Sequence, residues 1–278
     1  MTRIALFQAT SGLEPETNAE ALEQAIAKAA AGGAAMLFTP EMSGMVDRDR
    51  ERAAAKARSE EQDGVLARVR EAAAAKGIWV HLGSLALRAE DGGKLVNRGF
   101  VIDASGEIRA RYDKIHLFDV DLPTGESWRE SASYRPGTGA VVVTGTPVGA
   151  LGLTICYDLR FPALFAALAE GGAEVISVPA AFTVPTGDAH WHLLLRARAV
   201  EAGLFTVAAA QGGHHEDGRE TYGHSLVVGP WGEVLLDMGE EHGEVGFAEI
   251  DRTRIAEVRG RLPAIAHRRP IAPVAQPG

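Results

Sequence analysis

The sequence has 278 residues, 46% of them hydrophobic, and its 28 basic and 37 acidic side chains give a net charge of -9. This composition predicts one soluble globular domain over residues 1–278 and excludes a disordered chain, and without a basic run no nucleic acid partner is expected. No apolar stretch reaches the roughly 18 to 20 residues of a membrane span, and the first residues do not resemble a signal peptide, so we expect a cytoplasmic protein with no membrane partner.

The first part of the chain alternates apolar runs with Ala-rich or charged segments. Residues 3–10, RIALFQAT, predict a first strand, and an Ala-rich helix over residues 15–33 follows it. Residues 34–39 predict a second strand. A charged helix comes next, with Ser59 as its expected N-cap, and residues 78–85, IWVHLGSL, predict a third strand.

From residue 94 the pattern changes to short strands joined by turns. Residues 97–103 and 108–114 are expected to form a hairpin that turns at Ser105 and Gly106. The β/α alternation then resumes. In chain order we expect a strand at 151–156, a helix at 161–172, a strand at 173–179, a helix at 188–203 and a strand at 204–211.

The last part of the chain predicts a second hairpin, over residues 222–237, then a strand over 243–250 and a short helix. Residues from about 265 to 278 contain several prolines and predict an extended tail. The two similarly ordered β/α halves therefore predict an α/β fold in which two sheets pack together with helices outside.

Three ionisable residues, Glu41, Lys114 and Cys156, lie at or just after the ends of predicted strands, where α/β folds place their ligand sites. Cys156 is the only cysteine of the chain. A turn from its strand into a helix would hold the sulfur on a sharp bend, with the helix dipole favouring the thiolate. The alternative is a small buried hydrophobic residue.

Glu41 follows an apolar strand, so it would be partly desolvated and able to exchange a proton near neutral pH; the alternative is a helix cap or a loop residue. Lys114 is one of five lysines against 23 arginines, which indicates a need for a compact charge; the alternative is a solvated residue on a half-exposed strand. Together, Glu41 as base, Cys156 as nucleophile, and Lys114 with the Tyr157 N–H as oxyanion donors predict an acyl-transfer site.

Histidine offers two other interpretations. A papain-like hydrolase would use His116 or His224 as the base for the cysteine. A metal site is not expected among the histidines at positions 190, 192, 214, 215 and 224, because His190 and His192 face different sides of a helix and no Glu or Cys completes a ligand set. We expect no metal and no organic cofactor.

The segments FTPEMSG, YDKIHLFDVDLP and GLTICYDLRFP resemble, in order, the three signature segments of the nitrilase superfamily of carbon–nitrogen hydrolases. The resemblance implies a four-layer α-β-β-α sandwich that pairs through its helices into a dimer or larger even oligomer. It also implies a Glu41–Lys114–Cys156 triad that hydrolyses a nonpeptide amide or nitrile through a cysteine thioester. Glu130 takes the place of a second glutamate near the substrate, with Glu126 as its alternative.

Within the superfamily, the segments VPTGDAHWHLLLRARAVE and YGHSLVVGPWGEVL resemble the Nit branch, which implies deaminated glutathione as substrate. The ω-amides α-ketoglutaramate and α-ketosuccinamate are the alternative, and a catalytically silent scaffold or redox sensor is another. Arg160 is expected to bind a substrate carboxylate, with Phe182 and Thr183 in the pocket wall. Asp188 and His192 depart from the pattern of the branch.

Overall fold

Two six-stranded sheets lie face to face in the computed structural model, which describes residues 1–89, 91–121, 125 and 127–274. The first sheet has the order β16 (Glu244–Ile250), β1 (Thr2–Gln8), β2 (Met36–Phe38), β3 (Trp79–Arg88), β4 (Leu95–Ile102), β5 (Ile108–Asp113). The second has the order β15 (Val234–Asp237), β14 (Leu226–Val228), β11 (Phe205–Ala208), β10 (Val175–Ser177), β9 (Gly149–Leu153), β8 (Val141–Thr146).

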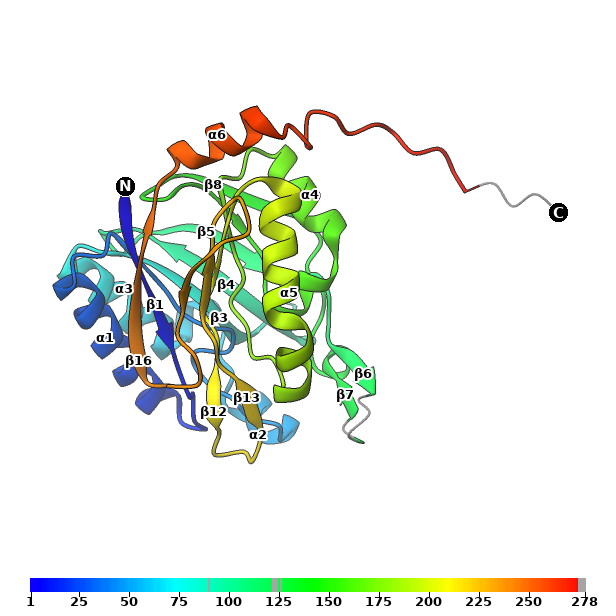
Figure 1. The fold of residues 1–278 in the computed structure, drawn as a ribbon. Coiled ribbons are helices and arrows are strands. Elements are labelled where there is room, and N and C mark those ends of the chain that lie inside the picture. Colours follow the sequence, from blue (N-terminus) through cyan, green and yellow to red (C-terminus); the bar gives the residue numbers. More distant parts are fainter. Residues whose placement is uncertain (90, 122–124, 126, 275–278) are drawn as a thin grey trace.

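Helices cover the outer face of each sheet. Helices α1 (Pro15–Ala31) and α3 (Gly64–Lys76) lie on the side of the first sheet, and α4 (Pro162–Glu170) and α5 (Val184–Ala202) on the side of the second (Figure 1). The short helix α2 (Arg50–Lys56) lies at one end of the molecule and α6 (Thr253–Arg261) at the other. The predicted four-layer α-β-β-α sandwich is confirmed.

Alternation along the strands builds two separate cores. On β1, Ile4 and Leu6 pack into the core that includes the second sheet, whereas Ala5 and Phe7 pack into the core that includes α1 and α3. This period of two is that of a strand buried on both faces. Each fully buried Leu or Ile contributes about 1.5–3 kcal/mol to stability.

The Ala-rich helix forms where the sequence predicts it. Pro15 stands in the first turn of α1, and the buried positions Leu22, Ala25, Ile26 and Ala29 form one stripe toward the sheet. The hairpin between β4 and β5 turns at Gly106, whose φ of 83° an L-residue other than glycine adopts only with strain. Both predictions are confirmed.

The expectation that Ser59 caps the following helix is wrong. Glu60–Gln62 form a single 3₁₀ turn after Ser59, and the Ser59 side chain makes no capping hydrogen bond. Helix α3 begins at Gly64, and the Asp63 carboxylate accepts the Leu66 N–H at 2.8 Å. Asp63 is therefore the N-cap that sets the start of the helix, because its carboxylate satisfies a free backbone N–H of the first turn.

Gly83 lets the two sheets approach each other closely beside the ends of β2 and β10. A Cβ atom at this position would lie 2.1 Å from the Thr39 carbonyl oxygen and 2.6 Å from Pro179 Cβ. Thr39 follows β2 of the first sheet, and Pro179 follows β10 of the second. A side chain at Gly83 would therefore push the two sheets apart.

Two small ribbons complete the structure at the end of the molecule where α2 lies: β6 (Asp119–Asp121) pairs with β7 (Ser127–Arg129), and β12 (Gly212–His214) with β13 (Glu220–Tyr222) (Figure 1). At the opposite end, residues 268–274 form no helix or strand and run away from α6. Among the described residues, no helix has the length and apolar character that crossing a membrane needs.

Candidate active site

Glu41, Lys114 and Cys156 meet at one edge of the sandwich. Strands β1, β2 and β3 run parallel, and so do β9, β10 and β11, so each set of carboxyl ends lies at one edge of its sheet. Glu41 follows β2, Lys114 follows β5 and Cys156 follows β9. The stacked sheets bring these three strand ends together, as the pattern predicts.

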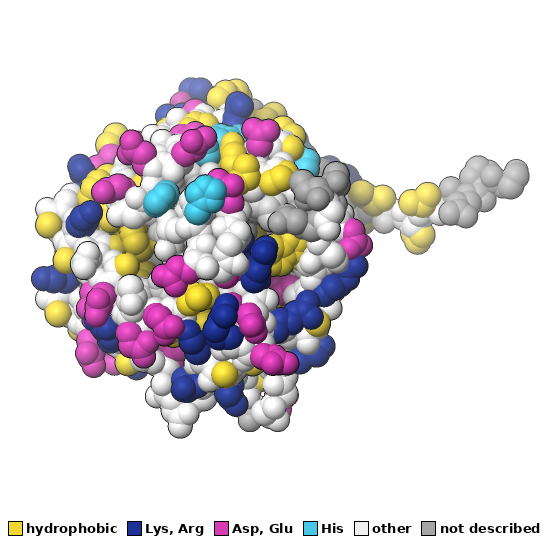
Figure 2. Space-filling view, turned by 90° about the horizontal axis from the view of Figure 1, so that it is seen from below, with side chains coloured by type: hydrophobic (Ala, Val, Ile, Leu, Met, Phe, Trp, Pro, Cys, Tyr) yellow, Lys and Arg dark blue, Asp and Glu magenta, His cyan; other side chains and the backbone are white. Residues whose placement is uncertain are grey.

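A cavity of about 540 Å³ opens at this edge. The predicted site residues all lie in its lining: Glu41, Lys114, Glu130, Cys156, Tyr157, Arg160, Phe182 and Thr183. Figure 2 views the molecule from the end that carries the two ribbons and shows Lys and Arg side chains gathered across the middle and right-hand side of this face. Glu126, the alternative to Glu130, lies outside the described residues.

Lys114 bridges the two carboxylates. Its Nζ donates to Glu41 Oε1 at 2.8 Å and to Glu130 Oε2 at 2.9 Å. The Lys114 and Glu41 side chains are only 2% and 6% exposed, so water cannot take over these contacts. Burying a charge is costly unless it is paired, and here each charge has an opposite partner. The backbone N–H of Phe118 also donates to Glu130 Oε2, which fixes this second carboxylate.

Asn97 is a member of this cluster that the sequence patterns do not reveal. It lies on β4, fully buried, and its Nδ2 donates to Glu41 Oε1 at 2.9 Å and to Glu130 Oε1 at 3.3 Å. The sequence contains no clear signal for it, because Asn97 begins the predicted strand 97–103 and is followed by another polar residue, Arg98. Asn97 thereby holds the two glutamates in a fixed arrangement around Lys114.

The charges of this cluster set the protonation states. Burial opposes the charge on Lys114, but the carboxylates of Glu130 and Glu41 outweigh it and raise the pKa of Lys114 well above its usual value. Burial and the adjacent Glu41 carboxylate raise the pKa of the Cys156 thiol well above its usual value. The expectation that the helix dipole favours the thiolate is therefore wrong for the resting protein, in which a neutral thiol lies beside a carboxylate.

The backbone around Cys156 is sharply bent. Strand β9 ends at Leu153, earlier than expected, and Cys156 begins a 3₁₀ turn with φ at 51°, a conformation that non-glycine residues seldom adopt. The Cys156 N–H donates to the Pro179 carbonyl at 2.9 Å and anchors the bend on the loop after β10. Such strain clusters at functional sites, where the surrounding structure maintains it.

Asp158 stabilises this turn from within. It is fully buried, and its carboxylate accepts the Tyr112 hydroxyl at 2.7 Å, the Ile155 N–H at 2.9 Å and the His116 N–H at 3.0 Å. These partners occupy Asp158, which forms no ion pair with Arg160. Asp158 is thus a structural residue of the turn that carries the cysteine.

No histidine is available as base in the described part of the cavity lining. His116 contacts Asp158 through Nδ1 at 2.7 Å and stacks on Phe161 with ring centroids 3.6 Å apart. His224 contacts Asp237 instead. The papain-like interpretation therefore lacks its base, and the ionisable side chain that lies next to the thiol as a hydrogen-bond partner is Glu41.

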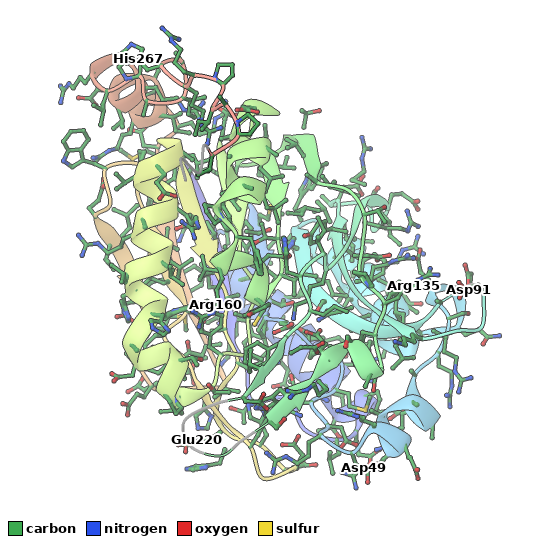
Figure 3. The ribbon with its side chains drawn as sticks, turned by 90° about the vertical axis from the view of Figure 1, so that its right-hand side faces the viewer. Asp49, Asp91, Arg135, Arg160, Glu220 and His267 are labelled. Carbon is green, nitrogen blue, oxygen red and sulfur yellow. The ribbon has the colours of Figure 1, made fainter. Side chains whose placement is uncertain are left out.

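Arg160 lies at the wall of the cavity without a carboxylate partner among the described residues. Its guanidinium lies 5.6 Å from the centroid of Phe182 and 3.3 Å from His190 Nδ1. Figure 3 shows Arg160 beside α5, whereas Arg135 and Asp91, which form an ion pair, lie together at the far side of the molecule. Arg160 is thus free to bind an anionic group in the cavity.

Two further arginines of the cavity lining lie around Trp128. The guanidinium groups of Arg48 and Arg219 lie 5.9 and 4.9 Å from the Trp128 ring centroid. Arg219 is also paired with Asp217, whereas Arg48 has no carboxylate partner in the described part of the chain. Among the described residues of the cavity lining, three arginines have no carboxylate partner and are available for anions: Arg160, Arg48 and Arg50, the last of which donates to the Arg129 carbonyl.

Residues 3–260 match the carbon-nitrogen hydrolase family. The deaminated glutathione amidase of Yersinia enterocolitica is 41% identical over 272 residues, which cover 96% of this chain and 92% of that protein. The crystal structure of the NitFhit protein of C. elegans is 38% identical with a TM-score of 0.87, covering 96% of this chain and 65% of that one.

An amidase from Nesterenkonia is a more distant structural relative. It is 28% identical with a TM-score of 0.77, and the match covers 95% of this chain and 98% of that one. That structure shows the Michael addition of acrylamide at the active-site cysteine of a variant enzyme. A cysteine is thus the reactive group of that amidase.

Proposed function

The chain belongs to the carbon–nitrogen hydrolase family, and on that premise we propose that this amidase hydrolyses deaminated glutathione through a thioester on Cys156. The observation that carries the proposal is the buried Glu41–Lys114–Glu130 cluster beside the only thiol of the chain. The whole chain acts as one catalytic domain, since the family match extends from residue 3 to residue 260.

In the first half of the reaction, Glu41 takes the proton of the Cys156 thiol as the sulfur attacks the amide carbon. The C–S bond forms, and the carbonyl oxygen becomes an oxyanion near Lys114 Nζ and the Tyr157 N–H. Glu41 then gives its proton to the departing nitrogen as the C–N bond breaks. The amine leaves, and the acyl group remains on sulfur.

In the second half, water attacks the thioester. Glu41 takes a proton from this water, the C–S bond breaks, and the thiolate regains the proton. Glu130 positions Lys114, from which its Oε2 accepts a hydrogen bond at 2.9 Å. No metal or organic cofactor takes part in these steps.

The cavity fits an extended substrate with two carboxylates. Deaminated glutathione has one carboxylate beside its keto group and another at its glycine end. Arg160, four residues after Cys156 in the chain, binds the first, and Arg48, beside Trp128, binds the second. Phe182 and Thr183 form the wall against the chain between them. A volume of about 540 Å³ lies within the range of about 300–1,000 Å³ usual for sites of this kind.

The test compares deaminated glutathione with α-ketoglutaramate, since both release α-ketoglutarate. We expect a higher kcat/KM for deaminated glutathione. Arg48→Ala should raise KM for this substrate alone, and Arg160→Ala should raise KM for both. A higher kcat/KM for α-ketoglutaramate in the wild-type protein, retained in the Arg48→Ala and Arg160→Ala variants, would make the protein an ω-amidase. No turnover of either amide would favour a silent scaffold or redox sensor.

An exposed apolar face supports the proposed self-association of the protein. Apolar side chains of α5, Leu193 and Val200, are exposed, and so is Trp231 on the β14–β15 turn. Arg196 Nε donates to the Gly232 carbonyl at 2.8 Å, which joins helix and turn into one face. Two copies pair through this face into a dimer or larger even oligomer.

The proposed location is the cytoplasm, whose reducing conditions would keep Cys156 as a thiol.

A further inference from the structure

Three potential metal ligands converge outside the cavity. His192 lies on α5, His224 just before β14, and Asp237 at the end of β15. His192 Nε2 lies 2.9 Å from Asp237 Oδ2, and His224 Nδ1 lies 2.9 Å from Asp237 Oδ1. None of the three lines the cavity of Cys156. The proposed amide hydrolysis therefore leaves this cluster without a role.

The expectation of no metal site considered only Glu and Cys as partners for these histidines, whereas the third side chain of this cluster is an aspartate. Asp237 lies 45 positions after His192 and 13 after His224, so no local spacing relates the three. The pairing of β14 with β15 and the packing of α5 on β14 bring them together. His192 is also one of the two positions at which the sequence departs from the Nit-branch pattern.

The geometry suits a small transition-metal ion. One ligand atom from each of the three side chains can be chosen so that all lie within 4.8 Å of one another. Tetrahedral zinc with bonds of about 2.0–2.1 Å places its ligand atoms about 3.3 Å apart, so small side-chain adjustments from the present N···O distances of 2.9 Å admit the ion. Imidazole nitrogen with a carboxylate oxygen is a common zinc ligand set, and water can fill the remaining position.

His224 is held in place before any ion binds. Its φ of 52° is in the left-handed region, and two hydrogen bonds maintain it: the His224 N–H donates to the Gly239 carbonyl, and Trp191 Nε1 donates to the His224 carbonyl, both at 2.8 Å. The ring stacks on Tyr222 with centroids 4.4 Å apart. Rigid ligands of this kind lose little freedom when a metal binds.

Asp237 is oriented in the same way. The backbone N–H of Gly239 donates to Asp237 Oδ1 at 2.9 Å, which fixes the carboxylate plane. Hydrogen bonds to ligand atoms of this kind orient metal-binding carboxylates. The side chains of His192 and Asp237 remain about one third exposed, at 33% and 34%, so an ion can reach them from solvent.

We propose that His192, His224 and Asp237 bind one Zn²⁺ ion per chain, which ties α5 to the β14–β15 hairpin. The N-terminal end of α5 carries Thr183 and Thr186 into the cavity wall, so the ion would brace the helix that borders the active site. The alternative is a cluster held only by hydrogen bonds from two imidazoles to one carboxylate.

The experiment titrates metal-free protein with Zn²⁺ against a chromophoric competing chelator at neutral pH. We expect one ion per chain and a rise of the unfolding temperature with free Zn²⁺. Zinc X-ray absorption of the loaded wild-type protein should show two imidazole ligands. His192→Gln and Asp237→Asn should each weaken zinc binding by about tenfold or more.

His214→Gln is the matched control. His214 is an exposed imidazole that faces a single carboxylate, Glu220, at 3.3 Å, and its loss should leave zinc binding unchanged. Absence of stoichiometric zinc binding by the wild-type protein would overturn the proposal. A zinc X-ray absorption spectrum of the wild-type protein that shows fewer than two imidazole ligands would also overturn it. This measurement does not depend on whether the variants fold.

Discussion

Two clusters of charged or ionisable side chains, the Lys114 cluster and the His192–His224–Asp237 cluster, are built by the same fold in different surroundings. Lys114 and Glu41 are 2% and 6% exposed, whereas His192 and Asp237 are about one third exposed. Both clusters join segments far apart in the chain. The difference is that water can replace a lost partner at the surface and cannot do so in the cavity.

This contrast separates what each cluster can do. The buried cluster keeps charges in fixed positions at low dielectric, which suits the stabilisation of an oxyanion. The exposed cluster can exchange its hydrogen bonds for an ion from solvent. Changes to the buried cluster should therefore have large effects on both stability and turnover, and changes to the exposed one small effects on stability.

Lys114→Met should have the largest effect. It leaves the Glu41 and Glu130 carboxylates close together without their cation, so the free energy of unfolding should fall by about 3–5 kcal/mol, and turnover should be lost. Urea unfolding and α-ketoglutarate release measure the two effects. Lys94→Met is the control, since the exposed Lys94 forms no ion pair among the described residues and donates to a backbone carbonyl, that of Ser131. Equal losses of unfolding free energy in Lys114→Met and Lys94→Met would contradict the distinction between buried and exposed charges.

Glu41→Gln should lower kcat by about 10²–10⁴-fold, because it removes the proton acceptor and keeps the side-chain shape. The same change should lower the pKa of Cys156, since the Glu41 charge and its hydrogen bond raise it. The ultraviolet absorbance of the thiolate measures this pKa directly, as Cys156 is the only cysteine. A thiol that titrates at the same pH in both proteins would argue against direct contact with Glu41.

Gly83→Ala should lower the free energy of unfolding by about 1–3 kcal/mol, because its Cβ meets the Thr39 and Pro40 carbonyl oxygens after β2 and the Pro179 ring after β10. Turnover should fall as well, since the displaced segments carry Glu41 and contact Cys156. Gly139→Ala provides the control, as a Cβ there meets nothing within 4 Å. Equal unfolding free energies and equal turnover in the Gly83→Ala and Gly139→Ala variants would show that the structure accommodates the Gly83 Cβ without loss of stability.

Asp237→Asn in the metal-free protein should have the smallest effect, about 1 kcal/mol or less in unfolding free energy, because its partners are partly exposed. Urea unfolding in the presence of a chelator measures it. A loss as large as that of Lys114→Met would remove the distinction between buried and exposed clusters.

The sequence predicts much of the layered fold and the meeting of Glu41, Lys114 and Cys156, because both follow from strand patterns and from where strands end. It does not predict Asn97, since an amide within a strand has no spacing that relates it to Glu41. Asp237 escapes prediction for the same reason. The start of α3 was misplaced because Ser59 and Asp63 are both good N-caps, and only packing selects between them.

The protonation state of Cys156 also depends on tertiary structure. Sequence shows a turn after a strand, which suggests a helix dipole near the sulfur. Burial and the Glu41 carboxylate outweigh that dipole and raise the pKa of the thiol. Neither effect can be read from neighbouring residues in the chain.

The most direct test is to trap the acyl-enzyme. Protein mixed with excess deaminated glutathione, quenched in acid within the first turnover and digested, is analysed by mass spectrometry. An α-ketoglutaryl thioester is expected on the peptide that contains Cys156, and it should disappear when the substrate is exhausted. Turnover by the Cys156→Ala variant, or an acyl group on any other residue, would contradict the account.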